Sequence, residues 1–223
     1  MRFTFDDLVA VMARLRSDQG CPWDRQQTHA TLGRYLLEEA HETLEAIARE
    51  DAAALREELG DLLLQVVFHG QLGREAGTFT AEDVVDSLVR KLLARHPHVF
   101  GDLRLGTARE VEVQWEELKR RAEPGRGPLD GIPATLPALA RVQAVVERLA
   151  RAESSRELTD AAAAAATLRA AADAALAVAA APEAARTRAV GDLLLAAVRL
   201  ATALQVDAEA ALRAAGDRIA IRH

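Results

Sequence analysis

The feature that most constrains the fold is a start signal for helices that recurs along the chain. Three times, a threonine precedes a carboxylate by three residues: Thr4 and Asp7, Thr80 and Asp83, Thr107 and Glu110. A hydroxyl followed by a carboxylate at this spacing is typical of a capped helix start. Apolar residues at helical spacing follow each signal, and aromatic residues, at 4% of the chain, are too scarce for a β-sandwich or barrel. The sequence therefore predicts an all-α protein.

Apolar periodicity places five helices in the first half of the chain. We expect them over residues 5–17, 30–49, 52–74, 81–95 and 108–121, with a loop over 20–29 and a stop at Pro97. The Pro/Gly-dense stretch 123–137 reads as a linker that splits the chain near residue 130. We therefore expect two domains, 1–125 and 126–223.

Charge and composition exclude several classes of partner. The chain has 28 Lys and Arg against 34 Asp and Glu, a net charge of -6, so a nucleic acid would be repelled by the average surface. The single cysteine, Cys21, excludes an internal disulfide and fits a reducing compartment. Charged residues interrupt every apolar stretch, so neither a signal peptide nor a membrane span is expected. We predict a cytoplasmic protein without a membrane or nucleic-acid partner.

Two acidic patterns stand on helices that should form an antiparallel hairpin. They are Glu38-Glu39-Ala40-His41-Glu42 and Glu57-Glu58-Leu59-Gly60-Asp61. If the hairpin turns near Glu50, residues whose numbers sum to about 100 lie level, so Glu39 faces Asp61 and Glu42 faces Glu58. Within each helix the paired acids are three apart and share a face. Four carboxylates should converge on one patch.

The second of these helices is otherwise almost entirely apolar. Its polar stripe is narrow and consists of Glu58, Asp61, Gln65 and His69. Such a helix should be buried, and carboxylates about 5 Å apart repel by roughly 3 kcal/mol per pair at an effective dielectric constant near 20. The patch then needs protons or cations, and oxygen ligands favour Mg²⁺ or Mn²⁺ over zinc. The alternative is an ordinary solvated acidic face.

An internal repeat supplies a comparison. Residues 59–67, LGDLLLQVV, reappear as residues 190–198, VGDLLLAAV, at an offset of 131. Asp61 is kept as Asp192 and Glu42 is replaced by another acid, but the rest of the polar stripe and its partners are lost. Glu38, Glu39, Glu42, Glu58, Gln65 and His69 become Arg169, Ala170, Asp173, Ala189, Ala196 and Leu200. Unless the match is a chance likeness of two alanine-rich helices, the first repeat holds the chemistry and the second keeps only the packing.

These motifs together resemble the MazG family of nucleoside triphosphate pyrophosphohydrolases. The acidic patterns are preceded by Cys-Pro-Trp-Asp at 21–24 and Gln-Thr-His at 27–29, and followed by RHPHVFGD at 95–102. The resemblance implies a tandem MazG-type helical bundle and a homodimer. It also implies Mg²⁺-dependent cleavage between the α and β phosphates of a nucleoside triphosphate, which yields the monophosphate and pyrophosphate.

The resemblance implies roles for five acidic residues, at the positions that match the motifs of the family. Glu39, Glu42, Glu58 and Asp61 would be the metal ligands, and Glu38 would hold or deprotonate the attacking water. The second repeat departs from the family, since members commonly retain the carboxylate set there. Residues 126–223 are therefore expected to be a degenerate repeat without activity.

Cationic and aromatic side chains near the acidic helices are candidates for contacts with the substrate. Lys91 and Arg95, one helical turn apart, are candidates for the outer phosphates, and Trp23 and His29 for the base. The alternatives are ordinary surface cations for the first pair and core packing for Trp23. His41 and His69 are expected to be hydrogen-bonded structural histidines, while Trp115 should pack and residues 119–121 should form a solvated helix end.

Two other functions compete with this one. The sequence Glu38-x-x-His41 is one half of a di-iron carboxylate motif, but such a site needs two copies. A non-catalytic helical scaffold or partner-binding module is favoured by the loss of polar residues in the second repeat. Release of pyrophosphate from nucleotides distinguishes the enzyme from both.

Overall fold

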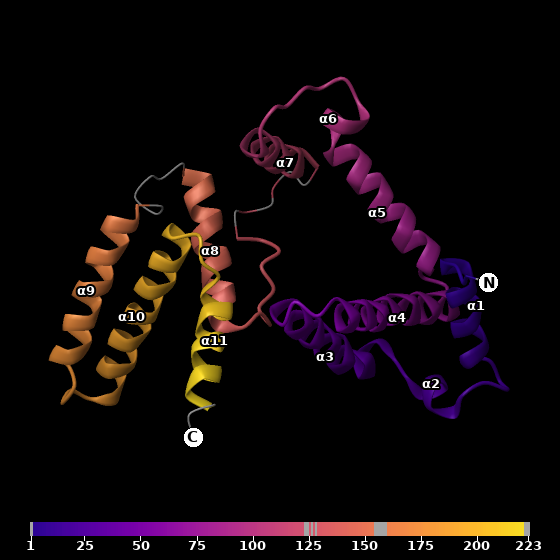
Figure 1. Ribbon diagram of the computed structural model, residues 1–223, viewed down its shortest axis with the longest axis horizontal. Coiled ribbons are helices and arrows are strands. Elements are labelled where there is room, and N and C mark those ends of the chain that lie inside the picture. Colours follow the sequence, from indigo (N-terminus) through magenta and orange to yellow (C-terminus); the bar gives the residue numbers. More distant parts are fainter. Residues whose placement is uncertain (1, 123–124, 126, 128, 154–159, 221–223) are drawn as a thin grey trace. The chain divides into compact units, whose positions relative to one another are not determined.

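The computed structural model describes the chain except residues 1, 123–124, 126, 128, 154–159 and 221–223. The described residues form helices and connecting segments and no β-strand, which confirms the all-α prediction. The chain divides into two compact units, 1–119 and 120–223 (Figure 1).

The first unit contains the five predicted helices, with ends that differ from the prediction by at most two residues. Two short helices were not predicted, and one of them corrects the expected loop at 20–29. In order, the elements are α1 (Phe5–Leu15), α2 (Pro22–Gln26), α3 (His29–Ala48), α4 (Ala52–Ala76), α5 (Ala81–Arg95), α6 (Pro97–Phe100) and α7 (Ala108–Ala122), the last ending just beyond the unit. Proline opens both short helices, where its fixed φ suits the first position.

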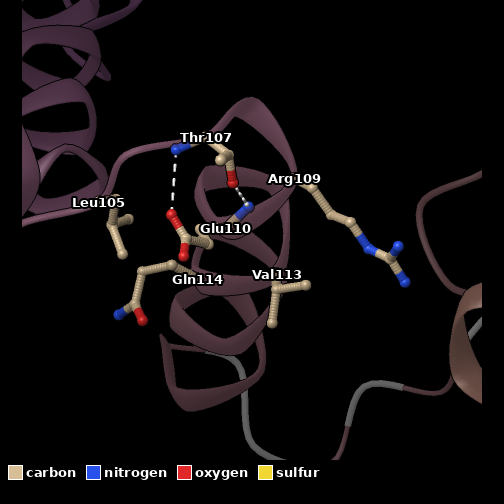
Figure 2. A pocket seen from close by; sticks show the side chains of 6 residues that line it. All are labelled: Leu105, Thr107, Arg109, Glu110, Val113 and Gln114. Atoms are coloured by element: carbon tan, nitrogen blue, oxygen red, sulfur yellow. Dashed lines mark hydrogen bonds between the residues drawn. The ribbon is translucent and has the colours of Figure 1, made fainter.

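Capping contacts explain where several of these helices begin. The backbone nitrogens of Thr4 and Thr80 donate to carboxylates three residues ahead at 2.8 Å. Figure 2 shows the third predicted signal, beside a surface pocket at the start of α7: Glu110 Oε2 accepts from the Thr107 nitrogen at 3.0 Å, and the Glu110 nitrogen donates to the threonine hydroxyl at 3.2 Å. All three predicted signals are therefore confirmed as helix starts.

Helices α3 and α4 form an antiparallel hairpin that turns at Glu50, as predicted. Glu50 has a positive φ of 54°, which lets the chain reverse within three residues. The Asp51 carboxylate then accepts from the Ala53 and Ala54 nitrogens at 3.0 and 3.1 Å and caps α4. This turn fixes which residues of the two helices lie level.

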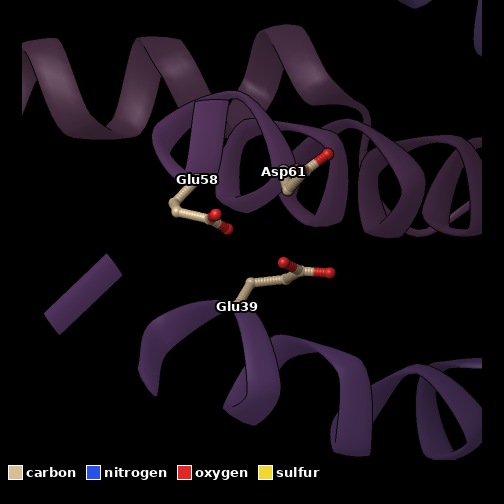
Figure 3. Close-up of side chains that lie close together, drawn as sticks. All are labelled: Glu39, Glu58 and Asp61. Atoms are coloured by element: carbon tan, nitrogen blue, oxygen red, sulfur yellow. The ribbon is translucent and has the colours of Figure 1, made fainter. Parts of the chain in front are cut away.

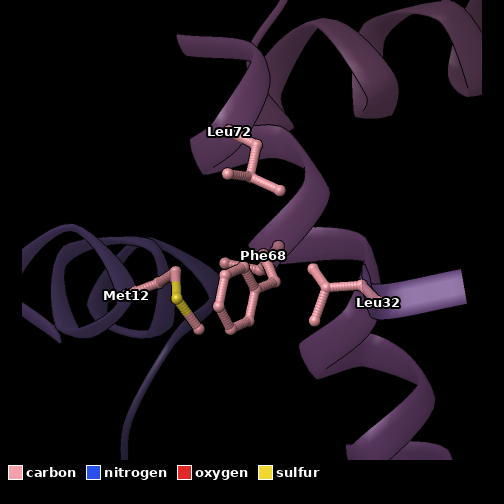
Figure 4. Close-up of a cluster of buried hydrophobic side chains, with 5 residues drawn as sticks. Met12, Leu32, Phe68 and Leu72 are labelled. Carbon is pink, nitrogen blue, oxygen red and sulfur yellow. The ribbon is translucent and has the colours of Figure 1, made fainter. Parts of the chain in front are cut away.

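The core of the first unit joins α1 to the open end of the α3–α4 hairpin, formed by the amino end of α3 and the carboxyl half of α4. Its buried side chains are Met12, Leu32, Val67, Phe68 and Leu72 (Figure 4). Tyr35 and Leu64 pack against this cluster from the side nearer the acidic residues. The acidic patch therefore stands on a hairpin whose far half is held by α1.

Two glycines let the α4–α5 connection fold back onto α4. A Cβ at Gly70 would lie 2.7 Å from the Ala81 nitrogen, and one at Gly73 would lie 2.5 Å from the Phe79 carbonyl oxygen. Alanine and leucine occupy the aligned positions 201 and 204, and α10, with 21 residues, ends four residues earlier than α4, with 25. The glycines thus serve the longer helix of the first repeat, whose last turn lies under the connection to α5.

The prediction that α4 is buried all round is wrong for its amino half. Leu59, Leu63 and Val66 are 51%, 40% and 38% exposed. They follow one helical face, and α1 covers only the other end of the helix. Helix α5 likewise exposes apolar side chains at helical spacing, Val85, Leu88, Val89 and Leu92. Within the described unit, nothing covers these two stripes.

The second unit repeats the hairpin plan. Its helices are α8 (Ala138–Glu153), α9 (Ala161–Ala177), α10 (Glu183–Ala203) and α11 (Ala208–Ala220). Helices α9 and α10 pack as a hairpin, and α8 contacts both α10 and α11. Helix α10 begins 131 residues after α4, the offset found in the sequence.

Among the described residues, no single helix is long and apolar enough to cross a membrane. One pair, Glu183–Ala203 with Ala208–Ile219, reaches the required length and composition only together, and the two helices are bent by 108°.

Candidate metal centre

Three carboxylates meet between α3 and α4 (Figure 3). Glu39 points from α3 toward Glu58 and Asp61 on α4, and one carboxylate oxygen from each lies within 4.8 Å of the others. All three side chains are half-buried. The predicted hairpin register, which set Glu39 level with Asp61, is confirmed by this arrangement.

Burial and mutual repulsion raise the pKa of two carboxyl groups in this cluster. Partial burial raises the pKa of Glu39, and the charges of Asp61, Glu42 and Glu58 raise it further. Burial likewise raises the pKa of Glu58, followed by the repulsion of Glu42 and Asp61. The cluster therefore favours protonation or a bound cation.

The other two predicted acids stand beside this cluster and are exposed. Glu42 acts on Glu58 both through its charge and through a hydrogen bond between the two side chains. Glu38 exerts the weakest of the repulsions on Glu39, and its charge also acts on Arg34. Glu42 thus belongs to the cluster, while Glu38 lies at its solvent side.

The donor set fits a hard divalent cation. Among the described residues, Glu39, Glu58 and Asp61 are the one group of three or more His, Cys, Asp or Glu side chains close enough to share an ion. Carboxylate oxygens at this spacing, without thiolate or imidazole, suit Mg²⁺ or Mn²⁺. The raised pKa values of Glu39 and Glu58 agree with a site that binds positive charge.

Two of the predicted substrate contacts lie around the amino end of α3. Trp23, on α2, is 49% exposed and meets the Tyr35 ring edge-on at 5.7 Å between ring centres. His29 Nδ1 lies 2.7 Å from His69 Nδ1, and the two rings are parallel. Burial, and then the proximity of His29, lowers the pKa of His69. His69 is thus hydrogen-bonded, as predicted, while the role of Trp23 and His29 stays a prediction.

The two predicted phosphate contacts are on α5. Lys91 is exposed, and the Arg95 guanidinium lies 5.3 Å from the centre of the Trp115 ring. Figure 1 shows the carboxyl half of α5, which carries both cations, extending away from the α3–α4 hairpin. The first unit does not bring them to the carboxylates, and their role also stays a prediction.

One network of hydrogen bonds, around Arg16, was not predicted from the sequence. Arg16 donates from Nε and Nη2 to the Glu75 carboxylate at 2.8 and 2.6 Å, and from Nη1 to the carbonyl oxygens of Asp24 and Gln27. Gln71 also donates to Glu75, at 2.9 Å. Arg16 thereby fixes the segment that carries Trp23 and leads into His29. Because Arg16 and Glu75 are 59 residues apart, no local pattern could reveal the pair.

The fold and the site define a class of protein: all-α, with carboxylates of one helical hairpin at the spacing of a shared metal ion. The MazG nucleotide pyrophosphohydrolase domain matches residues 27–100, which include all five acidic site residues. A nucleoside triphosphate pyrophosphohydrolase of Escherichia coli (strain K12) is 40% identical over 218 residues, covering 96% of this chain and 83% of that protein. A second relative, the nucleoside triphosphate pyrophosphohydrolase/pyrophosphatase MazG of Thermotoga maritima, is 40% identical over 229 residues, covering 95% of this chain and 80% of its own length.

A solved structure, the mazG-related protein from Thermotoga maritima, is 28% identical with a TM-score of 0.44 and covers 52% of this chain and 98% of its own. On the first two of these matches, the chain belongs to the MazG family of nucleoside triphosphate pyrophosphohydrolases.

Proposed function

We infer that this chain hydrolyses nucleoside triphosphates between the α and β phosphates and releases the nucleoside monophosphate and pyrophosphate. One observation carries this conclusion: Glu39, Glu58 and Asp61 converge within 4.8 Å inside the segment that matches the MazG domain. Such an activity would suit the removal of unwanted nucleotides from the cellular pool.

The acidic cluster supports a metal-dependent mechanism. Glu39, Glu42, Glu58 and Asp61 would hold Mg²⁺, for which Mn²⁺ can substitute. When bound, the ion supplies positive charge for the phosphates and lowers the pKa of water. Glu38, on the solvent side of the cluster, would orient the attacking water and accept its proton.

Substrate contacts follow from side chains that remain accessible. The half-exposed Trp23 ring and the exposed His29 would contact the base. Lys91 and Arg95 would meet the outer phosphates. Since α5 carries them away from the hairpin of its own chain, they would reach a site only through a second copy or a movement of α5.

The uncovered stripes on α4 and α5 support a homodimer. A second copy would cover Leu59, Leu63 and Val66, which one chain leaves exposed next to the carboxylates. In this arrangement residues 126–223 form a degenerate repeat that contributes packing without chemistry, and the protein works in the cytoplasm without a membrane or nucleic-acid partner. We expect Leu63→Glu to convert a dimer into a monomer in multi-angle light scattering, whereas a wild type that elutes as a monomer contradicts the proposal.

The decisive experiment measures pyrophosphate release from the eight common nucleoside triphosphates with and without Mg²⁺. We expect release by the wild type and loss of at least about 100-fold in Glu42→Gln and Asp61→Asn, since each removes a charged ligand. The matched control is Asp192→Asn, which changes the aligned aspartate of the second repeat and should leave activity intact. A wild type without Mg²⁺-dependent release would instead support a non-catalytic helical scaffold.

A further inference from the structure

One buried amide beside the carboxylates has no structural explanation. Gln65, on α4, is 5% exposed, and its Oε1 accepts no hydrogen bond from the described residues. A buried acceptor without a donor is a net cost to folding, so native structures rarely keep one without a use. The amide of Gln65 therefore calls for a partner from outside the chain.

Its place in the helix aims the amide at the site. Gln65 follows Asp61 by four residues, which is one turn along the same face and about 6 Å of rise. Long side chains on a helix lean toward its amino end, here toward Asp61. The amide thus continues the polar stripe that the carboxylates begin.

The second unit shows that packing does not require an amide here. The aligned residue is Ala196, which is 2% exposed, so the position is buried in both repeats. The amide is missing in the repeat that has also lost Glu39 and Glu58, whose aligned residues are Ala170 and Ala189. Gln65 therefore varies with the carboxylates rather than with the core.

The surroundings indicate which part of a nucleotide lies against it. Aromatic rings stand next to Gln65: Tyr35, one turn before Glu39 on α3, lies level with it, and His69, stacked on His29, lies one turn further from the hairpin turn. Arg34 lies 4.4 Å from the centre of the Tyr35 ring, whereas Arg49, toward the turn, pairs with Glu45 at 2.8 Å. Aromatic rings suit the base of a nucleoside, so the nucleoside half of the nucleotide fits this side of the carboxylates.

We propose that the Gln65 amide is a specificity-determining contact that hydrogen-bonds the nucleoside half of the substrate, at a sugar hydroxyl or base edge next to the metal cluster. This inference rests on the proposed function only for the identity of the ligand as a nucleotide. A neutral amide offers one acceptor and two donors, which match a hydroxyl or the edge of a base. It offers no charge to a phosphate or a metal ion.

The test is Gln65→Met, which keeps the shape of the side chain and removes its polar atoms. Calorimetry with Mg²⁺ measures dissociation constants for the eight common nucleoside monophosphates and for pyrophosphate. We expect the best monophosphate to bind about fivefold to tenfold more weakly, the effect of a lost neutral hydrogen bond, and pyrophosphate to bind within twofold of the wild type. The melting temperature of the metal-free protein should rise, because the buried acceptor is gone. Gln65→Ala, the residue of the second repeat, should weaken the monophosphate equally.

Gln71→Met is the matched control. Gln71 lies on another face of α4, is 8% exposed and also has a buried Oε1 without a partner, but its Nε2 donates to Glu75. This variant should leave monophosphate binding unchanged. Unchanged monophosphate binding in Gln65→Met, equal weakening of pyrophosphate, or a changed Mn²⁺ dissociation constant would each overturn the inference. Failure of the proposed function itself would appear separately, as a wild type that releases no pyrophosphate.

Discussion

Arg16 holds together three segments that the acidic hairpin alone would not connect. Its side chain is 8% exposed and binds Glu75 on α4 and the carbonyl oxygens of Asp24 and Gln27. Its guanidinium also lies 5.5 Å from the centre of the Phe68 ring in the core. Arg16→Ala removes all of these contacts at once, and we expect it to destabilise the first unit.

The size of this loss follows from the exposure of the two partners. Removing one member of a fully buried pair costs about 3–5 kcal/mol, and an exposed pair contributes about 0–1 kcal/mol. Glu75 is 38% exposed, so water can solvate it again in the variant, but the two carbonyl oxygens lose a charged donor. We expect a decrease of about 2–3 kcal/mol in the free energy of unfolding.

Tryptophan fluorescence during urea denaturation measures this directly, because Trp23 and Trp115 both lie in the first unit. The matched control is Arg90→Ala, which breaks the exposed pair of Arg90 with Asp86 and should cost less than about 0.5 kcal/mol. The variant that lacks Arg16 should also have a higher KM for nucleotide, since the segment that carries Trp23 is no longer anchored. Equal losses in the two variants would refute this account of Arg16.

Three further outcomes are expected. Millimolar Mg²⁺ should raise the melting temperature of the wild type. Glu58→Ala should abolish most of that increase and stabilise the metal-free protein. A melting temperature that does not change with Mg²⁺ would mean that the carboxylates form a solvated acidic face. Because the hydrogen bond from Arg16 lowers the pKa of Glu75 from 4.5, its contribution is complete above that pH and is lost as the pH falls through the folded value, so wild type and Glu75→Gln should differ in urea midpoint at pH 7 and converge in acid. Gly70→Ala should cost about 1–3 kcal/mol in the same urea assay, because its Cβ meets the backbone of Ala81, whereas Gly33→Ala, with open space around it, should be neutral or stabilising.

The sequence was sufficient for features that depend on neighbouring residues or on one hairpin. Threonine caps fixed helix starts, and the turn at Glu50 set Glu39 level with Asp61. The apolar pattern of α4 could not tell whether a side chain is covered by its own chain or by another, so Leu59 was wrongly expected to be buried. The contact between Arg16 and Glu75 depends on how α1 docks, which no local spacing encodes.

Helix α4 presents two different surfaces within the same few turns. Glu58 and Asp61 face α3, while Leu59 and Leu63, interleaved with them, face outward. Any tilt or rotation of α4 would displace the carboxylate oxygens and the apolar side chains together. If the proposed homodimer covers this apolar stripe and the carboxylates bind the proposed Mg²⁺, ion affinity and self-association are thermodynamically linked: diluting the protein should then weaken its affinity for the ion, and adding the ion should strengthen the dimer.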